Sequence, residues 1–293
     1  MALEGRVAIV TGSGGGLGRS HVLYLARKDV RVVVNDLSQE AADRVAAEVT
    51  AAGGSALAIA GSVTDEKAMA ALVARVVDEW SRVDILVNNA GILRDKIFHR
   101  MSWSDWSDVI MVHLHGSFSM SRACATHFRE QNSGSMIHMT STSGLIGNFG
   151  QANYMAAKMG IVGLSRGIAL DMQRFNVRSN CVSPFAWSRL IGTIPDETPE
   201  EKARVERIKA MGPEKIAPIV AYLASDLAKD VTGQIFAARM NEIFLMSQSR
   251  PVRSVHSAEG WTPQTIANRA IPAMKSSFYP LDRSGDIFSW DPL

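Results

Sequence analysis

The chain has 293 residues, 46% of them hydrophobic, which is enough for one large α/β domain with or without an appendage. A formal net charge of +2, with basic residues scattered along the chain, does not indicate a nucleic-acid-binding protein. No apolar run approaches the roughly 18 residues of a membrane span. The two cysteines are too few for a disulfide framework, and the N-terminus leads into a strand rather than a signal peptide, so we expect a cytoplasmic protein.

The first motif consists of a strand, a glycine-rich loop and the start of a helix. Residues 7–10 form an apolar run that predicts a buried strand, and helical spacing begins near Arg19. TGSGGGLG lies between them at residues 11–18. Glycines let the backbone approach a pyrophosphate, and the N–H groups at a helix start favour its charge. We therefore expect this loop to bind a dinucleotide through Gly12, Ser13, Gly16, Leu17 and Gly18.

Asp36 follows the second predicted strand, residues 30–34, and lies 18 residues after Gly18. A carboxylate at this point can accept hydrogen bonds from both hydroxyls of an adenosine ribose, and it would repel a 2′-phosphate. Neither Gly15 nor Leu37 offers a compensating cation. We therefore expect NAD as the cofactor rather than NADP. A second interpretation, in which Asp36 caps the next helix, stays open because both roles can hold together.

Strands and helices alternate along the first 238 residues. Further strands are predicted at 56–60, 83–87, 136–140, 177–182 and 233–237, and helices at 40–52, 65–80, 102–131, 152–174, 200–211 and 213–227. This alternation predicts an α/β fold with a doubly wound parallel sheet, the Rossmann fold, whose ligands lie at the carboxyl ends of the strands. The strand ends that we expect at the cofactor carry Leu37, Ser62, Val63, Asn89, Ala90 and Gly91.

The last 55 residues, 239–293, do not continue this alternation. They contain several prolines and aromatic residues, too many aromatic residues for a disordered linker. We therefore predict one domain at 1–238 and a C-terminal extension at 239–293 that packs on the domain or on a neighbouring subunit. Residues 188–212 are polar and predict a mobile segment that covers a substrate pocket.

The chemistry is expected in residues 136–160. Tyr154 and Lys158 lie four apart, so they share one face of a helix, and Ser141 stands at the mouth of the preceding strand. A phenol with a pKa near ~10 is a poor base at neutral pH. The Lys158 ammonium and the positive nicotinamide ring stabilise the tyrosinate and so lower that pKa. We expect Tyr154 as general acid/base, Lys158 as its partner and Ser141 as the hydrogen-bond donor to the substrate oxygen. Thr140 and Ser143 compete with Ser141 for this role.

These motifs resemble the short-chain dehydrogenase/reductase family. The resemblance covers about residues 5–238 and rests on TGSGGGLG at 11–18, NNAG at 88–91, Ser141, and YxxxK at 154–158. The segments VNDL, NNAGILRD, VHLHGSF and GNFGQANYMAAK are similar to the hydroxyacyl-CoA dehydrogenase unit of peroxisomal multifunctional β-oxidation enzymes and their bacterial relatives, a unit also known as a 17β-hydroxysteroid dehydrogenase.

The resemblance implies NAD-dependent oxidation of a secondary alcohol to a ketone, with (R)-3-hydroxyacyl-CoA as substrate and 3-oxoacyl-CoA as product. A hydroxysteroid or another secondary alcohol is the alternative substrate. A regulator that senses NAD without turnover is the alternative of another class. The family also implies a homodimer or homotetramer, and binding of the nicotinamide ribose by Tyr154 and Lys158.

Two departures from the family pattern stand out. His113 occupies a position where many members carry a catalytic Asn, and we expect it to hold a water, shuttle a proton or simply pack. Pro184 is followed by Phe185 in place of the usual Gly, and the resemblance implies that Pro184 and Trp187 contact the nicotinamide. The seven histidines form no HExxH or Cys/His cluster, so no metal is expected.

Overall fold

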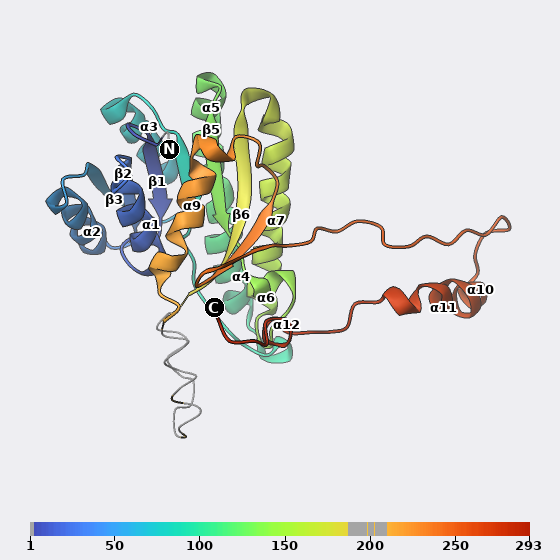
Figure 1. Cartoon of the computed structure of the whole chain (residues 1–293). Helices are drawn as coiled ribbons and strands as arrows, with labels where there is room; N and C mark the ends of the chain where they lie inside the picture. Colours follow the sequence, from blue (N-terminus) through green and yellow to red (C-terminus); the bar gives the residue numbers. More distant parts are fainter. Residues whose placement is uncertain (1–2, 187–197, 199–201, 203–209) are drawn as a thin grey trace.

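The computed structural model describes residues 3–186, 198, 202 and 210–293 (Figure 1). Its centre is an eight-stranded sheet in the order β3-β2-β1-β4-β5-β6-β7-β8. The neighbouring strands are parallel except for β7 and β8, which are antiparallel. The strands are β1 (Val7–Thr11), β2 (Arg31–Asp36), β3 (Ala56–Ala60), β4 (Ile85–Asn88), β5 (Gly134–Met139), β6 (Val177–Phe185), β7 (Ile235–Arg239) and β8 (Glu242–Leu245). The predicted doubly wound parallel sheet is confirmed, with one antiparallel strand, β8, added at its edge.

Helices cover both faces of this sheet. They are α1 (Gly16–Ala26), α2 (Gln39–Ala51), α3 (Glu66–Trp80), α4 (Trp103–Ile110), α5 (Gly116–Gln131), α6 (Thr142–Leu145), α7 (Ala152–Met172) and α9 (Ala217–Ala224). Successive side chains of a strand point to opposite faces of the sheet, so β1 contributes residues to two hydrophobic cores. Ala8 and Val10 pack with α1, α2 and α9, whereas Val7 and Ile9 pack with α3 and α5.

Two predicted helices differ from those observed. The helical region expected at 102–131 is interrupted by a π-helical segment, Met111–His115, between α4 and α5. The region expected at 213–227 is a 3₁₀ turn (Pro213–Lys215), then α9, then a second 3₁₀ turn (Asp226–Ala228). The helix expected at 200–211 and the pocket cover expected at 188–212 fall largely outside the described residues.

The tail begins as part of the sheet. The predicted boundary at residue 238 falls inside β7, and β8 follows after two residues and pairs with it. Beyond β8 the chain leaves the body, forms α10 (Pro263–Thr265), a π segment (Ile266–Ala270), α11 (Ile271–Met274) and a 3₁₀ turn (Lys275–Ser277), and returns to α12 (Ser284–Ile287) (Figure 1). In the part of the chain that the structure describes, no helix has the length and apolar character needed to cross a bilayer.

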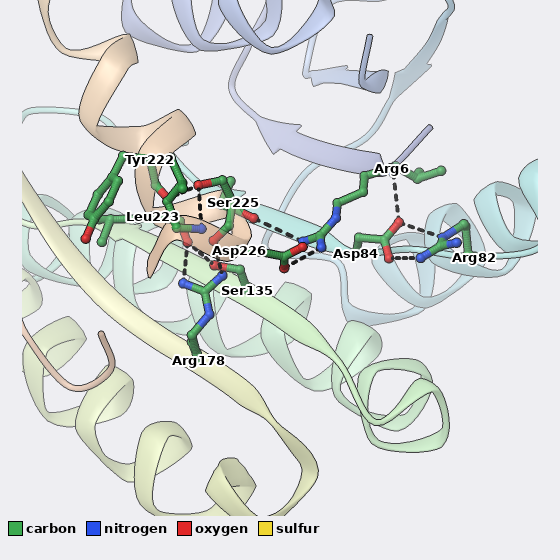
Figure 2. Close-up of polar contacts among 12 residues, drawn as sticks. Arg6, Arg82, Asp84, Ser135, Arg178, Tyr222, Leu223, Ser225 and Asp226 are labelled. Atoms are coloured by element: carbon green, nitrogen blue, oxygen red, sulfur yellow. Dashed lines mark hydrogen bonds and ion pairs between the residues drawn. The ribbon is translucent and has the colours of Figure 1, made fainter. Parts of the chain in front are cut away.

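Two arginines hold α9 at the amino-terminal edge of the sheet (Figure 2). The buried Arg178 of β6 donates to the backbone oxygens of Leu223, at 2.5 Å, and Ser225, at 3.0 Å. Arg6, just before β1, pairs with Asp226 at 2.5 Å. The last carbonyls of a helix lack intrahelical donors, so the guanidinium groups satisfy them and complement the helix dipole. A hollow of about 610 Å³ at this edge contains none of the predicted site residues.

We predict that Arg178→Met lowers the free energy of unfolding by about 2–3 kcal/mol, because buried carbonyls lose charge-assisted hydrogen bonds. Urea denaturation measures this loss. Arg122→Met, at an exposed arginine of α5, is the control and should change stability by less than about 0.5 kcal/mol. Equal stability of the two variants would contradict the role assigned to Arg178.

Candidate active site

The end of β5 and the start of α7 bring three predicted catalytic side chains together. Ser141 directly follows Thr140 at the end of the strand, and its hydroxyl caps α6 by accepting the N–H of Ser143 at 3.1 Å. Tyr154 lies in the first turn of α7 and Lys158 one turn further on. Thr140 Oγ1 donates to the backbone oxygen of Lys158 at 2.9 Å. Thr140 and Ser143, the predicted competitors of Ser141, therefore both have structural contacts here.

Burial changes the pKa values of both Tyr154 and Lys158. It raises the pKa of Tyr154, an effect opposed by the hydrogen bond with Ser141 and increased by the Asp95 carboxylate. Burial also lowers the pKa of Lys158 to about 7. The Lys158 ammonium lies 5.4 Å from the centroid of the Tyr154 ring and donates to the oxygen of Met139 at 2.6 Å. The expected lowering of the Tyr154 pKa depends on Lys158 and the positive nicotinamide ring together, and it stays a prediction.

His113 lies against Tyr154 with its ring edge-on, the ring centroids 5.2 Å apart. It belongs to the π-helical segment between α4 and α5, and π segments inside helices are frequent at functional sites. Its Nε2 lies 3.0 Å from the nitrogen and 2.7 Å from the oxygen of Ile92. Burial, reinforced by the Lys158 charge, lowers the pKa of His113 to about 3. The imidazole is therefore neutral at neutral pH, which favours a positioning role over a proton shuttle.

A glycine makes room for this histidine. A Cβ added at Gly91 would lie 2.4 Å from Cε1 of His113, closer than carbon atoms pack. Beneath it, Ser117 donates through its hydroxyl to the oxygen of His113 at 2.6 Å. Asn88, at the end of β4, donates to the oxygen of Ser117 at 3.4 Å and lies 3.1 Å from Nδ1 of the buried His138. His138 is thus a buried structural residue.

A cavity of about 340 Å³ opens at the carboxyl ends of β1, β2 and β4. Its lining includes nine of the residues predicted to bind cofactor: Gly12, Leu17, Asp36, Leu37, Ser62, Val63, Asn89, Ala90 and Gly91. The sequence analysis did not assign Gly15, Asn35, Gly61, Ile92 and Val112, which also line it. Gly15 lies in the glycine motif, and Asn35, Ile92 and Val112 lie in the segments VNDL, NNAGILRD and VHLHGSF, so these motifs could have identified four of the five. Asn35 and Gly61 lie at the carboxyl ends of β2 and β3. A prediction that included every polar or small residue at the strand ends would have found them.

The glycine loop also shapes the cavity through buried hydrogen bonds and close backbone contacts. Ser13 is buried and donates to the oxygen of Val10 at 2.7 Å. A Cβ at Gly18 would lie 2.4 Å from the oxygen of Gly12, so α1 and β1 can meet only with glycine there. Gly12 has φ +60° and its missing Cβ would lie 2.7 Å from Cα of Ala90. No side chain caps the start of α1 at Gly16, so backbone N–H groups remain for an anionic ligand.

Asp36 lies at the end of β2 with its carboxylate turned to the glycine loop. Its Oδ2 accepts the N–H of Gly14 at 2.9 Å, and Oδ1 accepts the N–H of Ser38 at 3.3 Å. The cap of α2 is Ser38, whose hydroxyl accepts the N–H of Ala41 at 3.2 Å. The alternative interpretation of Asp36 as the helix cap is therefore wrong. The carboxylate remains available at the cavity wall.

The tail contacts the end of β6 and the loop between Ser141 and Tyr154. Pro184 and Phe185 end β6, and the ring of Phe185 lies 4.8 Å from that of Phe288. Ser284 donates its N–H to the oxygen of Gly147, in the loop between Ser141 and Tyr154, at 2.9 Å. Trp187, the other predicted nicotinamide contact, lies outside the described residues. Among the residues that are described, no three His, Cys, Asp or Glu side chains are grouped as a metal site requires.

Comparison with known proteins agrees with this geometry. The family model described as short chain dehydrogenase matches residues 6–188. The mouse peroxisomal multifunctional enzyme type 2 is 40% identical over 242 residues, which are 80% of this chain and 31% of that protein. Hydroxyacyl-CoA dehydrogenase ChsB1 of Mycobacterium tuberculosis is 35% identical over 279 residues, 90% of this chain and 87% of that one.

Among solved structures, a short chain dehydrogenase from Mycobacterium avium superimposes with a TM-score of 0.84 at 34% identity, covering 96% of this chain and 98% of that chain. The chain belongs to the short-chain dehydrogenase/reductase family. It is therefore an oxidoreductase that acts on hydroxyl groups with a nicotinamide cofactor. The match to the mouse enzyme spans less than a third of that protein, so the activity of the whole mouse enzyme is not carried over.

The lowered pKa of Lys158 predicts how stability depends on pH. The unfolded chain keeps the lysine proton up to about pH 10.4, whereas the folded chain loses it near pH 7. Stability therefore rises with pH above 7, by at most about 1.4 kcal/mol per pH unit from this group. Lys158→Met should lack this rise when urea denaturation is compared at pH 7 and pH 9. The same slope in both proteins would contradict the burial of an ammonium at this position.

Proposed function

We propose that this chain is an NAD-dependent dehydrogenase that oxidises a (R)-3-hydroxyacyl-CoA to the 3-oxoacyl-CoA. The proposal rests on the contacts that join the cavity to the residues expected to transfer the proton. Gly91 and Ile92 line the cavity, and both contact His113, which lies edge-on to Tyr154. A cofactor bound in the cavity would thus end beside Ser141, Tyr154 and Lys158.

The cavity suits a dinucleotide whose adenosine ribose carries no 2′-phosphate. The uncapped start of α1 offers N–H groups to a pyrophosphate, and the Asp36 carboxylate can accept ribose hydroxyls. Ser62 and Val63 provide a wall for the adenine, and the exposed Leu37 provides its other side. No lysine or arginine lines this cavity in the described part of the chain, so a 2′-phosphate would meet a carboxylate without a cation. This favours NAD over NADP.

The chain's own residues handle the proton, while the nicotinamide supplies the hydride acceptor. The Ser141 hydroxyl hydrogen-bonds the substrate oxygen and stabilises the charge that develops there. Tyr154 takes the hydroxyl proton as general base in oxidation and returns it as general acid in reduction. The buried Lys158, whose pKa is lowered to about 7, can give up or accept a proton near neutral pH. It holds its proton at Nζ between the phenol ring and the oxygen of Met139.

The acyl-CoA substrate is supported by a relative rather than by a bound molecule. A relative that matches 90% of this chain carries the name hydroxyacyl-CoA dehydrogenase. The phosphates of a CoA thioester favour cations near the mouth of the pocket, and the tail contains several basic residues. In the structure, Arg239 is buried in an ion pair with Glu242, and the exposed Arg283 pairs with Asp286 at 2.6 Å. Arg283 also lies 5.5 Å from the ring of Phe149 in the loop between Ser141 and Tyr154, so among these two it is the candidate for a CoA phosphate.

We predict that the wild type reduces NAD with 3-hydroxyacyl-CoAs and that Tyr154→Phe lowers turnover by about 10² or more, because a positioned acid/base is lost. NADH absorbance measures the rate with (R)- and (S)-3-hydroxyacyl-CoAs of several chain lengths, a 17β-hydroxysteroid and simple secondary alcohols. NAD binding, measured by calorimetry, should persist in the variant. Faster oxidation of the steroid than of any 3-hydroxyacyl-CoA would contradict the proposed substrate. Binding of NAD without turnover of any alcohol would indicate an NAD sensor instead of an enzyme.

We predict that the wild type prefers NAD over NADP and that Asp36→Ala weakens NAD binding at least tenfold while NADP binding is kept or improved. The physical reason is loss of two ribose hydrogen bonds together with loss of repulsion toward a 2′-phosphate. Calorimetric titration with both cofactors measures the two constants. Asp43→Ala, on the neighbouring exposed turn of α2, is the matched control and should change neither. Tighter NADP than NAD binding by the wild type would contradict the assignment.

A further inference from the structure

His138, near the end of β5, is a buried histidine that the proposed reaction does not use. It lies opposite Asn88 of β4 in the register of the sheet, and paired residues of parallel strands point to the same face. Its Nδ1 lies 3.1 Å from Nδ2 of Asn88, whereas its Nε2 has no hydrogen-bond partner in the described part of the chain. Burial lowers the pKa of His138 to about 4, so the ring is neutral at neutral pH. Because an amide nitrogen can only donate, Nδ1 accepts this bond and the ring proton lies on Nε2.

Packing alone does not explain a histidine at this position. His138 is fully buried, and the residues before it, Met136 and Ile137, are apolar and fully buried as well. A buried donor without an acceptor costs free energy, which an apolar side chain of similar shape would avoid. An unpaired polar group in a native core therefore calls for another explanation. The hydrogen bond with Asn88 is the feature of His138 that an apolar residue could not supply.

The amide group of Asn88 reaches from the sheet to the first two turns of α5. Its Nδ2 lies 3.0 Å from Oγ of Ser121 and 3.4 Å from the backbone oxygen of Ser117. An amide nitrogen carries two hydrogens. When Nδ1 of His138 accepts one of them, the other is directed at α5. The acceptor on His138 therefore fixes the orientation in which Asn88 holds the start of this helix.

The start of α5 in turn holds the π-helical segment and its histidine. Ser117 Oγ donates to the backbone oxygen of His113 at 2.6 Å. The His113 ring contacts the backbone of Ile92 through Nε2 and lies 5.2 Å, centroid to centroid, from the ring of Tyr154. A continuous series of contacts thus leads from the floor of the sheet at His138 to the phenol of Tyr154.

We propose that His138 is a positioning residue for the reaction: by accepting a hydrogen bond from Asn88, it fixes the start of α5 and so holds His113 against Tyr154. This assignment rests on the proposed role of Tyr154 as general acid/base. Within the described part of the chain, His138 is not among the residues that line the cofactor cavity, so it acts through the contacts above and not on the cofactor. Without its Nδ1, Asn88 can turn and His113 can shift, and a misplacement of about 1 Å near reacting groups can lower a rate about 10²-fold.

Two substitutions at residue 138 separate the acceptor from the bulk of the side chain. His138→Leu removes the acceptor, whereas His138→Asn keeps one, because the amide oxygen of Asn lies close to the place of Nδ1. We expect kcat to fall about tenfold or more in His138→Leu, with KM for NAD within about twofold of the wild type, and to recover in His138→Asn. NADH absorbance measures both constants with the alcohol that the wild type oxidises fastest. An unchanged kcat in His138→Leu, or an equal loss in both variants, would overturn the proposal.

The position of His113 can be measured without turnover. Its Cε1–H signal in NMR, assigned with His113→Gln, depends on the distance to the Tyr154 ring. We expect this signal to move in His138→Leu and to keep its wild-type position in His138→Asn. An unmoved signal in His138→Leu would overturn the proposal. A wild type that oxidises no alcohol would contradict the proposed function instead, and the signal would still test the contact between His138 and His113.

His21 provides the matched control. It is as fully buried in α1 as His138 is in β5, and neither of its ring nitrogens has a hydrogen-bond partner among the described residues. His21→Leu therefore removes a buried imidazole without removing a contact that leads to His113. We expect kcat and the His113 signal to stay at their wild-type values in this variant. A loss of kcat as large as that of His138→Leu would show a general effect of removing a buried histidine, and would overturn the proposal.

Discussion

The attachment of α7 to the end of β5 is the contact on which the candidate active site depends. Thr140 Oγ1 donates to the oxygen of Lys158, and Lys158 Nζ donates back to the oxygen of Met139. These two bonds join the last residues of the strand to the second turn of the helix. Tyr154 lies one turn earlier on the same helix face, so its position relative to Ser141 follows from them. The arrangement also buries an ammonium, which accounts for the lowered pKa of Lys158.

A second set of contacts joins this group to the cofactor cavity. The π-helical segment places His113 between Gly91, just beyond the end of β4, and the ring of Tyr154. Gly91 and His113 depend on each other, because any side chain at residue 91 would occupy the space of the imidazole. The histidine in turn contacts the backbone of Ile92, which lines the cavity. A change in this segment would therefore act on the cavity and on Tyr154 together.

Much of the fold and part of the site follow from local sequence patterns. Apolar runs between helices predicted the seven parallel strands, and glycine spacing predicted the loop at β1, because both depend on neighbours in the sequence. The π segment was missed because a helical pattern from 102 to 131 has no break such as proline within it. Ile92 and Val112 were missed because only the folding of β4 against the α4–α5 region brings these apolar residues to the cavity. The burial that raises the pKa of Tyr154 could not be predicted from local patterns, because it depends on the whole fold.

The tail packs against the loop that carries the candidate active site as well as against the sheet. Phe288 contacts Phe185 of β6, and Arg239 of β7 donates to the oxygen of Trp290 at 3.0 Å. Ser284 donates its N–H to the oxygen of Gly147, which joins the tail to the loop between Ser141 and Tyr154. Alternation of strands and helices could not have predicted this link, because it joins residue 147 to residue 284 across 137 positions of the chain.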